Sequence, residues 1–165
     1  MKTSGIEDAL SGLFAELVRG ASSAGNAFIL NSGDAGLIRS LDTVSAAEAS
    51  ASMNGGATLA AHATHVSYGL SLMNRWAREG GNPFADAKWD DAWKTHAVNA
   101  EQWTAIRDEL RTECEGWAEM LRTPRELDAA GLKGVISSVA HLAYHLGAMR
   151  QISPSARGPK EGTFS

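Results

Sequence analysis

The residues best suited to chemistry are two histidines in the last third of the chain. His141 and His145 lie four residues apart, so on a helix their side chains project from one face with their bases roughly 6 Å apart. Two neutral imidazoles placed in this way can bind one metal ion, and zinc, nickel, copper and iron all accept imidazole ligands. The pair therefore predicts a metal site to which another segment must contribute a third ligand.

A second pair of histidines, His62 and His65, is available to supply that third ligand. Thr58 stands at an N-cap position and Gly80 at a helix end, which predicts a helix of about 22 residues between them. Both histidines lie beside the apolar stripe of this helix, next to the side that faces the core. Three imidazoles leave coordination positions open, which is the arrangement of catalytic rather than structural zinc sites.

Three more segments show the periodicity of long amphipathic helices. The first covers Ser4 to Arg19, the next begins at a capping box formed by Asn99 and Gln102 and runs to about Arg122, and the last covers Leu132 to Ile152. No segment alternates in the manner of a strand. The sequence therefore predicts an all-α four-helix bundle.

The connection between the second and third long helices, residues 80–98, is long and contains Trp89 and Trp93. When extended, it reaches farther than the roughly 33 Å of the preceding helix. We therefore expect it to pack along the bundle and to start the third helix parallel to the second. Its tryptophans are expected in the core or in an interface, where one or two of them could line a pocket.

The chain is expected to form one domain, residues 1–152, followed by an extended or flexible tail, residues 153–165, that is rich in Gly, Pro, Ser and charge. Short helical turns should follow Asp34 and the capping box of Ser45 and Glu48. These turns would connect the first long helix to the second.

Composition limits the function classes. The 165 residues carry a formal net charge of -4, so no nucleic-acid partner and no binding to an anionic membrane are expected. No apolar run approaches membrane-spanning length. The one cysteine, Cys114, cannot form an intramolecular disulfide, which fits a cytoplasmic location. Its position within a helix, without a histidine at helical reach, predicts a buried and inert thiol.

Two segments resemble a known family, the DinB/YfiT-like four-helix bundles. Thr58 to His65 resembles the second-helix segment of that family, in which a capping Ser or Thr is followed seven residues later by a metal-binding histidine. His141 to Arg150 resembles its final H-x-x-x-H segment, which continues through Gly to Arg. The resemblance selects His65 over His62 as the third ligand. Ala148 departs from the pattern, since many relatives carry Gln there.

The resemblance implies an up-down-down-up topology with the long crossover between helices 2 and 3, and frequent homodimers. It also implies a divalent metal, zinc or nickel, held by His65, His141 and His145. Several members are thiol transferases that use low-molecular-weight thiols, so the leading expectation is an enzyme that adds such a thiol to an electrophilic small molecule. A metal-dependent hydrolase and a noncatalytic small-molecule-binding or stress-response bundle remain alternatives, as does a metal-free bundle with structural histidines.

Four other side chains have more than one expected role. Tyr144 could donate a hydrogen bond at the metal or pack with its polar tip exposed. Arg150 could pair with a substrate carboxylate or with an acidic residue of a neighbouring helix. His62 could be a fourth ligand, a base beside the ligands or a residue of the bundle rim. His96 lies in the long connection and is expected at the surface.

Overall fold

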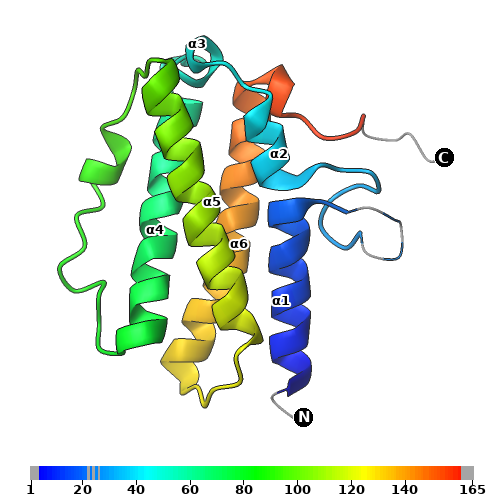
Figure 1. Cartoon of the computed structure of the whole chain (residues 1–165), viewed down its shortest axis with the longest axis vertical. Helices are drawn as coiled ribbons and strands as arrows, with labels where there is room; N and C mark the ends of the chain where they lie inside the picture. The colour runs from blue at the N-terminus through cyan, green and yellow to red at the C-terminus, as the bar shows by residue number, and fades with distance from the viewer. Residues whose placement is uncertain (1–3, 22, 24, 26, 161–165) are drawn as a thin grey trace.

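The computed structural model describes residues 4–21, 23, 25 and 27–160, and within these it contains α-helices and 3₁₀ turns but no strand (Figure 1). The prediction of an all-α fold is therefore confirmed for the described residues. None of the described helices is long and apolar enough to cross a membrane. The long helices are α1 (Ser4–Arg19), α4 (Leu59–Glu79), α5 (Ala100–Arg122) and α6 (Ala129–Ile152), and the short elements are α2 (Gly36–Asp42), α3 (Ala46–Ala49), η2 (Asp91–Trp93) and η3 (Pro154–Ala156).

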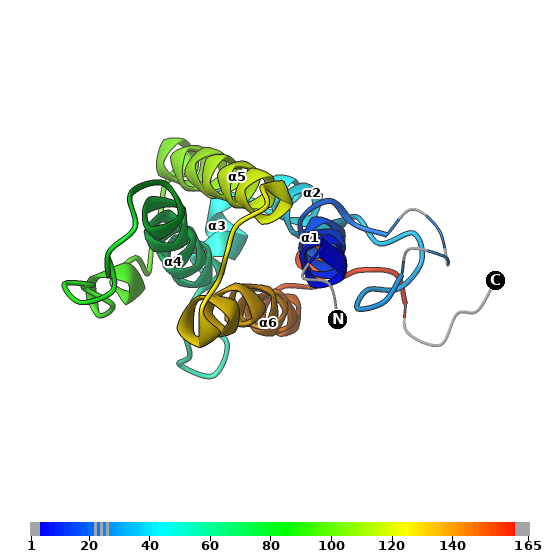
Figure 2. The same ribbon diagram turned by 90° about the horizontal axis from the view of Figure 1, so that it is seen from below.

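The four long helices form a bundle, with α2 and α3 near one end. Seen end on, α1 and α4 occupy opposite corners, with α5 and α6 at the other two (Figure 2). Helices α4 and α5 run in the same direction because residues 80–98 return along α4 (Figure 1). The returning segment is held at the start of α4, where Thr58 Oγ1 donates to the backbone oxygen of Thr95 at 3.4 Å.

Side-chain caps explain where α4 and α5 begin. Thr58 Oγ1 accepts a hydrogen bond from the backbone N–H of Ala61 at the start of α4. At the start of α5, Asn99 and Gln102 form the complete capping box, with each side chain accepting from the backbone of the other. Both caps satisfy N–H groups that have no partner inside the helix. The predicted starts of these two helices are confirmed.

Helix α6 begins at Ala129, earlier than the predicted Leu132. The carboxylate of Asp128 accepts from the backbone N–H of Gly131 at 2.7 Å, which caps a first turn made of weakly amphipathic residues. Hydrophobic periodicity alone does not detect such a turn, because small residues carry little apolar signal.

The chain stays ordered against the bundle after α6. Residues Pro154–Ala156 form the 3₁₀ turn η3, and Ala156 is buried in the core. The extended stretch expected from residue 153 therefore begins only after this turn. Residues 161–165 of the expected tail lie outside the described residues.

The core lies along the axis of the bundle and is built mainly from one stripe of each long helix. Trp117 of α5 is buried, and its Nε1 donates to Ser138 Oγ of α6 at 2.9 Å. Each large apolar side chain that is fully buried contributes about 1.5–3 kcal/mol relative to its exposed state. Besides Trp117, the largest fully buried apolar side chains are Phe14, Leu17, Leu37, Leu41, Leu59, Leu110, Leu142, Met149 and Val66.

We expect Gly12→Ala to stabilise the protein. Gly12 lies on the exposed side of α1, and no atom lies within 4 Å of the position that its Cβ would occupy. Alanine in a helix interior loses less backbone entropy on folding, so the free energy of unfolding should rise by about 0.5–1 kcal/mol in urea denaturation. Gly20→Ala is the control with the opposite sign, because Gly20 has a φ of 93° and its Cβ would overlap the backbone of Asp34. Destabilisation by Gly12→Ala would contradict this structure of α1.

Candidate metal centre

Three histidine side chains converge between α4 and α6. Nε2 of His141 lies 3.1 Å from Nε2 of His65 and 3.0 Å from Nε2 of His145. One ligand atom from each of the three residues lies within 4.8 Å of the others. The structure therefore brings together the three residues predicted as the ligand set.

Hydrogen bonding among the rings does not account for this arrangement. A neutral imidazole nitrogen carries either one hydrogen or one lone pair, yet Nε2 of His141 faces two other Nε2 atoms. A cation at the centre would satisfy all three lone pairs at once. With metal–nitrogen bonds of about 2.0–2.1 Å, tetrahedral ligands lie roughly 3.3–3.4 Å apart. The two distances from Nε2 of His141, 3.1 and 3.0 Å, are close to this value, so the residues fit a divalent ion.

Burial keeps the cluster neutral. Loss of hydration lowers the pKa of His145 to about 3 and the pKa of His65 to about 4, and the neighbouring histidines add to both effects. Burial also lowers the pKa of His141 and of His62. Because metals bind the neutral form of imidazole, these rings need not lose a proton before binding an ion at neutral pH.

The metal-free protein is expected to lose stability as the pH falls below about 6.5. The pKa of His65 is about 4 and that of His145 about 3 in the folded state, against 6.5 in the unfolded chain. Between these values the unfolded chain binds more protons, so stability that is complete above pH 6.5 decreases toward the folded pKa values. Urea denaturation with chelator, from about pH 7.5 to about pH 5, measures this loss. The His141→Ala/His145→Ala variant should show a shallower decrease, and equal slopes would contradict a buried neutral cluster.

His62 lies behind the cluster. Its Nδ1 is 2.9 Å from Nδ1 of His145, which is the ring nitrogen that does not face the other two ligands. When Nε2 of a neutral His145 presents its lone pair to an ion, Nδ1 carries the hydrogen and donates it to His62. Of the roles expected for His62, this geometry matches the base beside the ligands, since its partner is a ligand ring and not the shared centre.

The long crossover supplies an aromatic wall. The ring of Trp93 in η2 stacks on His65, with centroids 4.2 Å apart and planes at 23°, and Trp89 lies 5.6 Å from the same ring. Nδ1 of His65 is buried without a hydrogen-bond partner among the described residues, so stacking takes the place of a hydrogen bond in orienting this ring. The backbone N–H of Lys88 donates to the hydroxyl of Tyr68 at 2.8 Å, which fastens the crossover to α4.

An apolar pocket of about 230 Å³ adjoins His141. Helices α4 and α6 form two of its walls, and the crossover forms a third through Phe84 and Trp89. Gly69 lies at the meeting point of these walls, where a Cβ would make ordinary van der Waals contact with Cε1 of His141 at 3.7 Å and with Trp89 at 3.8 Å. None of the described residues that line the pocket is acidic. One of the three histidines is therefore exposed to an apolar cavity.

The remaining predicted residues lie apart from the three Nε2 atoms. Tyr144 packs its ring edge-on against His145 at 5.0 Å and is 70% exposed. Arg150 is bound to the buried carboxylate of Asp34 at 2.7 Å, so of its two expected roles the ion pair is the one observed. Asp34 belongs to the connection between α1 and α2 rather than to a helix. His96 is exposed, as expected.

Cys114 is fully buried in the core. Burial raises the pKa of its thiol to about 12. Since the thiolate is the nucleophilic form, this side chain is inert at neutral pH. The prediction of a buried thiol is confirmed, and the raised pKa supports the expectation that it is unreactive.

The lining of the pocket was not predicted from the sequence. Gly69 and Phe84 carry no motif, and they meet only because the crossover folds back over α4. The available signal was the pair of tryptophans in residues 80–98, which are too apolar for a solvated loop.

We compared the chain with known protein families, curated proteins and solved structures. A scan against protein-family models finds no match, and searches of curated proteins and of solved structures find no significant match. The side chains and their arrangement are therefore the basis for assigning a function.

Proposed function

We propose that this protein is a DinB-like, divalent-metal-dependent enzyme that adds a low-molecular-weight thiol to an apolar electrophile. The observation that carries the proposal is the convergence of three Nε2 atoms beside an apolar pocket. His65, His141 and His145 are the metal ligands in this proposal. A set of three leaves coordination positions for a reacting group.

The helix directions support a DinB-like bundle. In Figure 1, α4 and α5 run in one direction, α1 and α6 run in the other, and the long crossover joins α4 to α5. This arrangement is consistent with the up-down-down-up topology that the two histidine motifs imply. The proposal includes zinc or nickel as the metal, a homodimer as the assembly and the cytoplasm as the location, where small thiols remain reduced.

The chain itself does not provide the reacting thiol, because Cys114 is buried and its pKa is about 12. The thiol therefore belongs to a co-substrate. A divalent ion bound at the three histidines would lower the pKa of that thiol, so that the thiolate is present at neutral pH. In the transfer, the thiol proton goes to solvent, the sulfur forms a bond to the electrophilic carbon, and the leaving group departs with its electron pair.

The pocket determines the kind of electrophile. Its walls include Met73, Phe84 and Trp89, and its volume of about 230 Å³ suits a small uncharged molecule with an apolar or aromatic body. The aromatic wall over His65 also excludes water from one side of the site. Thiol transfer is favoured over amide hydrolysis because the leaving amine needs a general acid, and no Asp or Glu is among the described lining residues.

Elemental analysis of protein purified without chelator tests the metal site. The parent and a His96→Ala control should each contain about one divalent ion per chain, whereas the His141→Ala/His145→Ala variant should contain little. His96 is an exposed residue of the crossover, so the control removes a histidine without touching the cluster. Absence of metal from the parent after reloading would overturn the proposal.

An activity screen then separates thiol transfer from the alternatives. The metal-loaded parent should consume 1-chloro-2,4-dinitrobenzene in the presence of cysteine, glutathione or coenzyme A, and should lose this activity on chelation. Turnover of an ester or amide panel without thiol would instead identify a hydrolase. Metal binding without turnover in either screen would identify a noncatalytic binding protein.

A further inference from the structure

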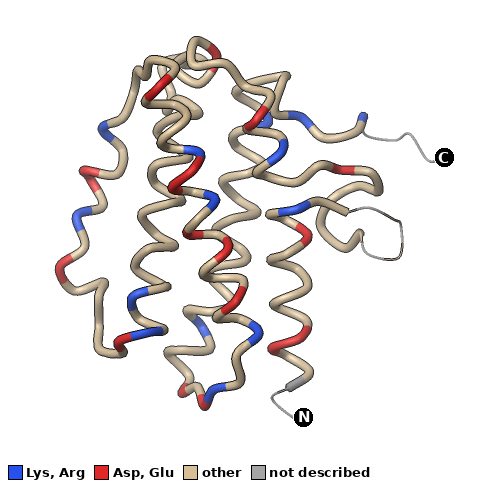
Figure 3. The backbone as a smooth tube through the Cα atoms, in the orientation of Figure 1, with Lys and Arg blue, Asp and Glu red and all other residues tan. Residues whose placement is uncertain are grey.

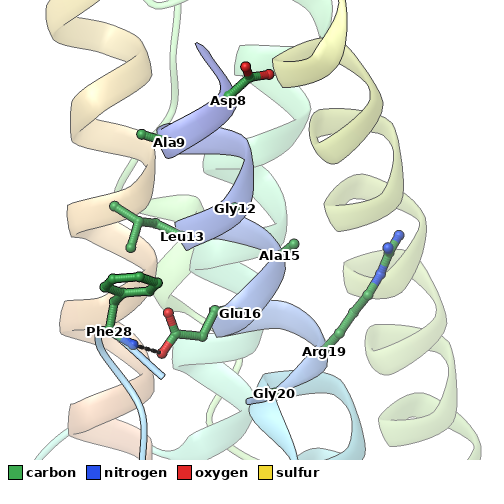
Figure 4. A pocket seen from close by; sticks show the side chains of 9 residues that line it. All are labelled: Asp8, Ala9, Gly12, Leu13, Ala15, Glu16, Arg19, Gly20 and Phe28. Carbon is green, nitrogen blue, oxygen red and sulfur yellow. Dashed lines mark hydrogen bonds between the residues drawn. The ribbon is translucent and has the colours of Figure 1, made fainter. Parts of the chain in front are cut away.

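A second pocket lies on the opposite side of the bundle from the metal centre. It is a cavity of about 590 Å³ along the outer surface of α1, with Phe28 at one side (Figure 4). Helix α1 and helix α4 occupy opposite corners of the bundle (Figure 2), and the pocket shares no lining residue with the one beside His141. Its contents therefore have no part in the proposed transfer reaction.

A buried carboxylate forms one end of this cavity. Oε1 of Glu16 accepts hydrogen bonds from the backbone N–H groups of Phe28, Ile29 and Leu30, at 3.0, 2.8 and 2.7 Å. These three N–H donors on one oxygen hold the segment 28–30 against α1. The side chain of Glu16 thus has a fixed position at the pocket.

The second oxygen of Glu16 has no such partner. Glu16 is only 5% exposed, and its Oε2 is buried without a hydrogen bond to any described residue. In Figure 4 this oxygen points along the surface of α1 toward Leu13, on the side of Glu16 where Phe28 lies. It is closed to solvent, so a ligand in the pocket reaches it when the exposed ring of Phe28 moves aside. A buried carboxylate oxygen without a donor is unfavourable, so a donor that enters the pocket gains the full benefit of satisfying it.

The rest of the lining is mostly apolar. Ala9, Gly12, Leu13 and Ala15 form the floor on α1. The ring of Phe28 is 79% exposed, which is unusual for a large aromatic side chain. The side chain of Arg19 extends away from Glu16 in Figure 4, and no ion pair involves Glu16 among the described residues.

We propose that this pocket binds a small organic cation in which a primary ammonium group carries an apolar body. The ammonium donates to Oε2 of Glu16 and neutralises its charge. The apolar body lies on the small residues of α1 and against Phe28, whose ring face also attracts a cation. An anionic ligand does not fit, because the buried charge at this site is negative.

Binding of the probe 2-phenylethylammonium to the full-length, metal-loaded protein tests the proposal. Two matched probes separate the contribution of the N–H donors from that of the positive charge. The N,N,N-trimethyl analogue keeps the charge but has no N–H donor, and 3-phenylpropanoate replaces the cation with an anion. Titration followed by NMR shifts of α1 residues should give a dissociation constant at least about tenfold lower for the primary amine than for either analogue. Equal binding of all three probes, or no binding of the amine, would overturn the proposal.

Two variants test the site from the protein side. Glu16→Gln keeps a carbonyl for the N–H groups of segment 28–30 and places an amide NH₂ where Oε2 stood, so amine binding should weaken at least about tenfold. Gly12→Leu should place a side chain in the pocket, since no atom lies within 4 Å of its Cβ position, and should weaken amine binding at least about tenfold. Gly5→Leu is the matched control, since Gly5 is equally open but does not line the pocket.

The variants also have results that would contradict the site. Binding by Glu16→Gln that equals the parent would exclude the carboxylate as the receptor. The proposal would be overturned if the parent failed to bind the amine and sedimentation showed a dimer that Gly12→Leu dissociates. This face of α1 would then be the contact with a second copy of the chain. Circular dichroism on each variant shows whether loss of binding occurs with the fold intact.

Discussion

Replacing His62 with alanine is expected to weaken metal binding about 10–100-fold while leaving all three ligands in place. Nδ1 of His62 is 2.9 Å from Nδ1 of His145 and is positioned to accept its hydrogen. Without this acceptor, His145 loses the interaction that selects the tautomer with a free lone pair on Nε2, and its ring is less well oriented. Competition against a chelator of known affinity measures the change.

The variant His62→Asn distinguishes this role from direct coordination. The Oδ1 atom of asparagine is separated from Cα by the same number of bonds as Nδ1 of histidine, so it can accept the hydrogen of His145 and restore most of the affinity. His96→Ala should have no effect. The absorption spectrum of the cobalt-substituted protein should be unchanged in His62→Asn. A changed spectrum, or no rescue by asparagine, would indicate that His62 is a ligand instead.

Replacing Trp117 with alanine is expected to lower the free energy of unfolding by about 3–5 kcal/mol. Trp117 is 1% exposed and fills the space between α5 and α6. Its removal leaves a cavity and also deprives Ser138 of the indole N–H that lies 2.9 Å from its Oγ. Urea denaturation of the metal-free protein measures the loss without a contribution from metal binding.

Two variants separate the causes of this loss. Trp117→Phe keeps an aromatic ring but removes the N–H, so it should cost clearly less than alanine. Trp89→Ala removes a tryptophan that is 37% exposed in the crossover, and it should change the stability by less than about 1.5 kcal/mol. If Trp89→Ala were as destabilising as Trp117→Ala, the crossover would contribute to the core to an extent that this structure does not show.

Local interactions made several features predictable from the sequence. The caps at Thr58 and Asn99 act within one helical turn, so the starts of α4 and α5 followed from residue type and spacing. The spacing of His141 and His145 placed both on one face of α6 for the same reason. The start of α6 at Ala129 was not predicted, because the first turn of this helix depends on the cap at Asp128 and contains few apolar side chains.

Contacts between distant segments were decided only by the tertiary structure. The sequence offered both His62 and His65 as partners for the pair on α6, and the register of α4 against α6 turns His65 toward the shared centre and His62 toward the far nitrogen of His145. The same holds for Glu16, whose carboxylate meets the backbone of segment 28–30 through a loop that has no motif. The sequence determined which side chains could do chemistry, because residue type sets their reactivity and spacing along one helix sets which of them share a face. Which of them meet was decided by packing, because helix register depends on every side chain between the helices.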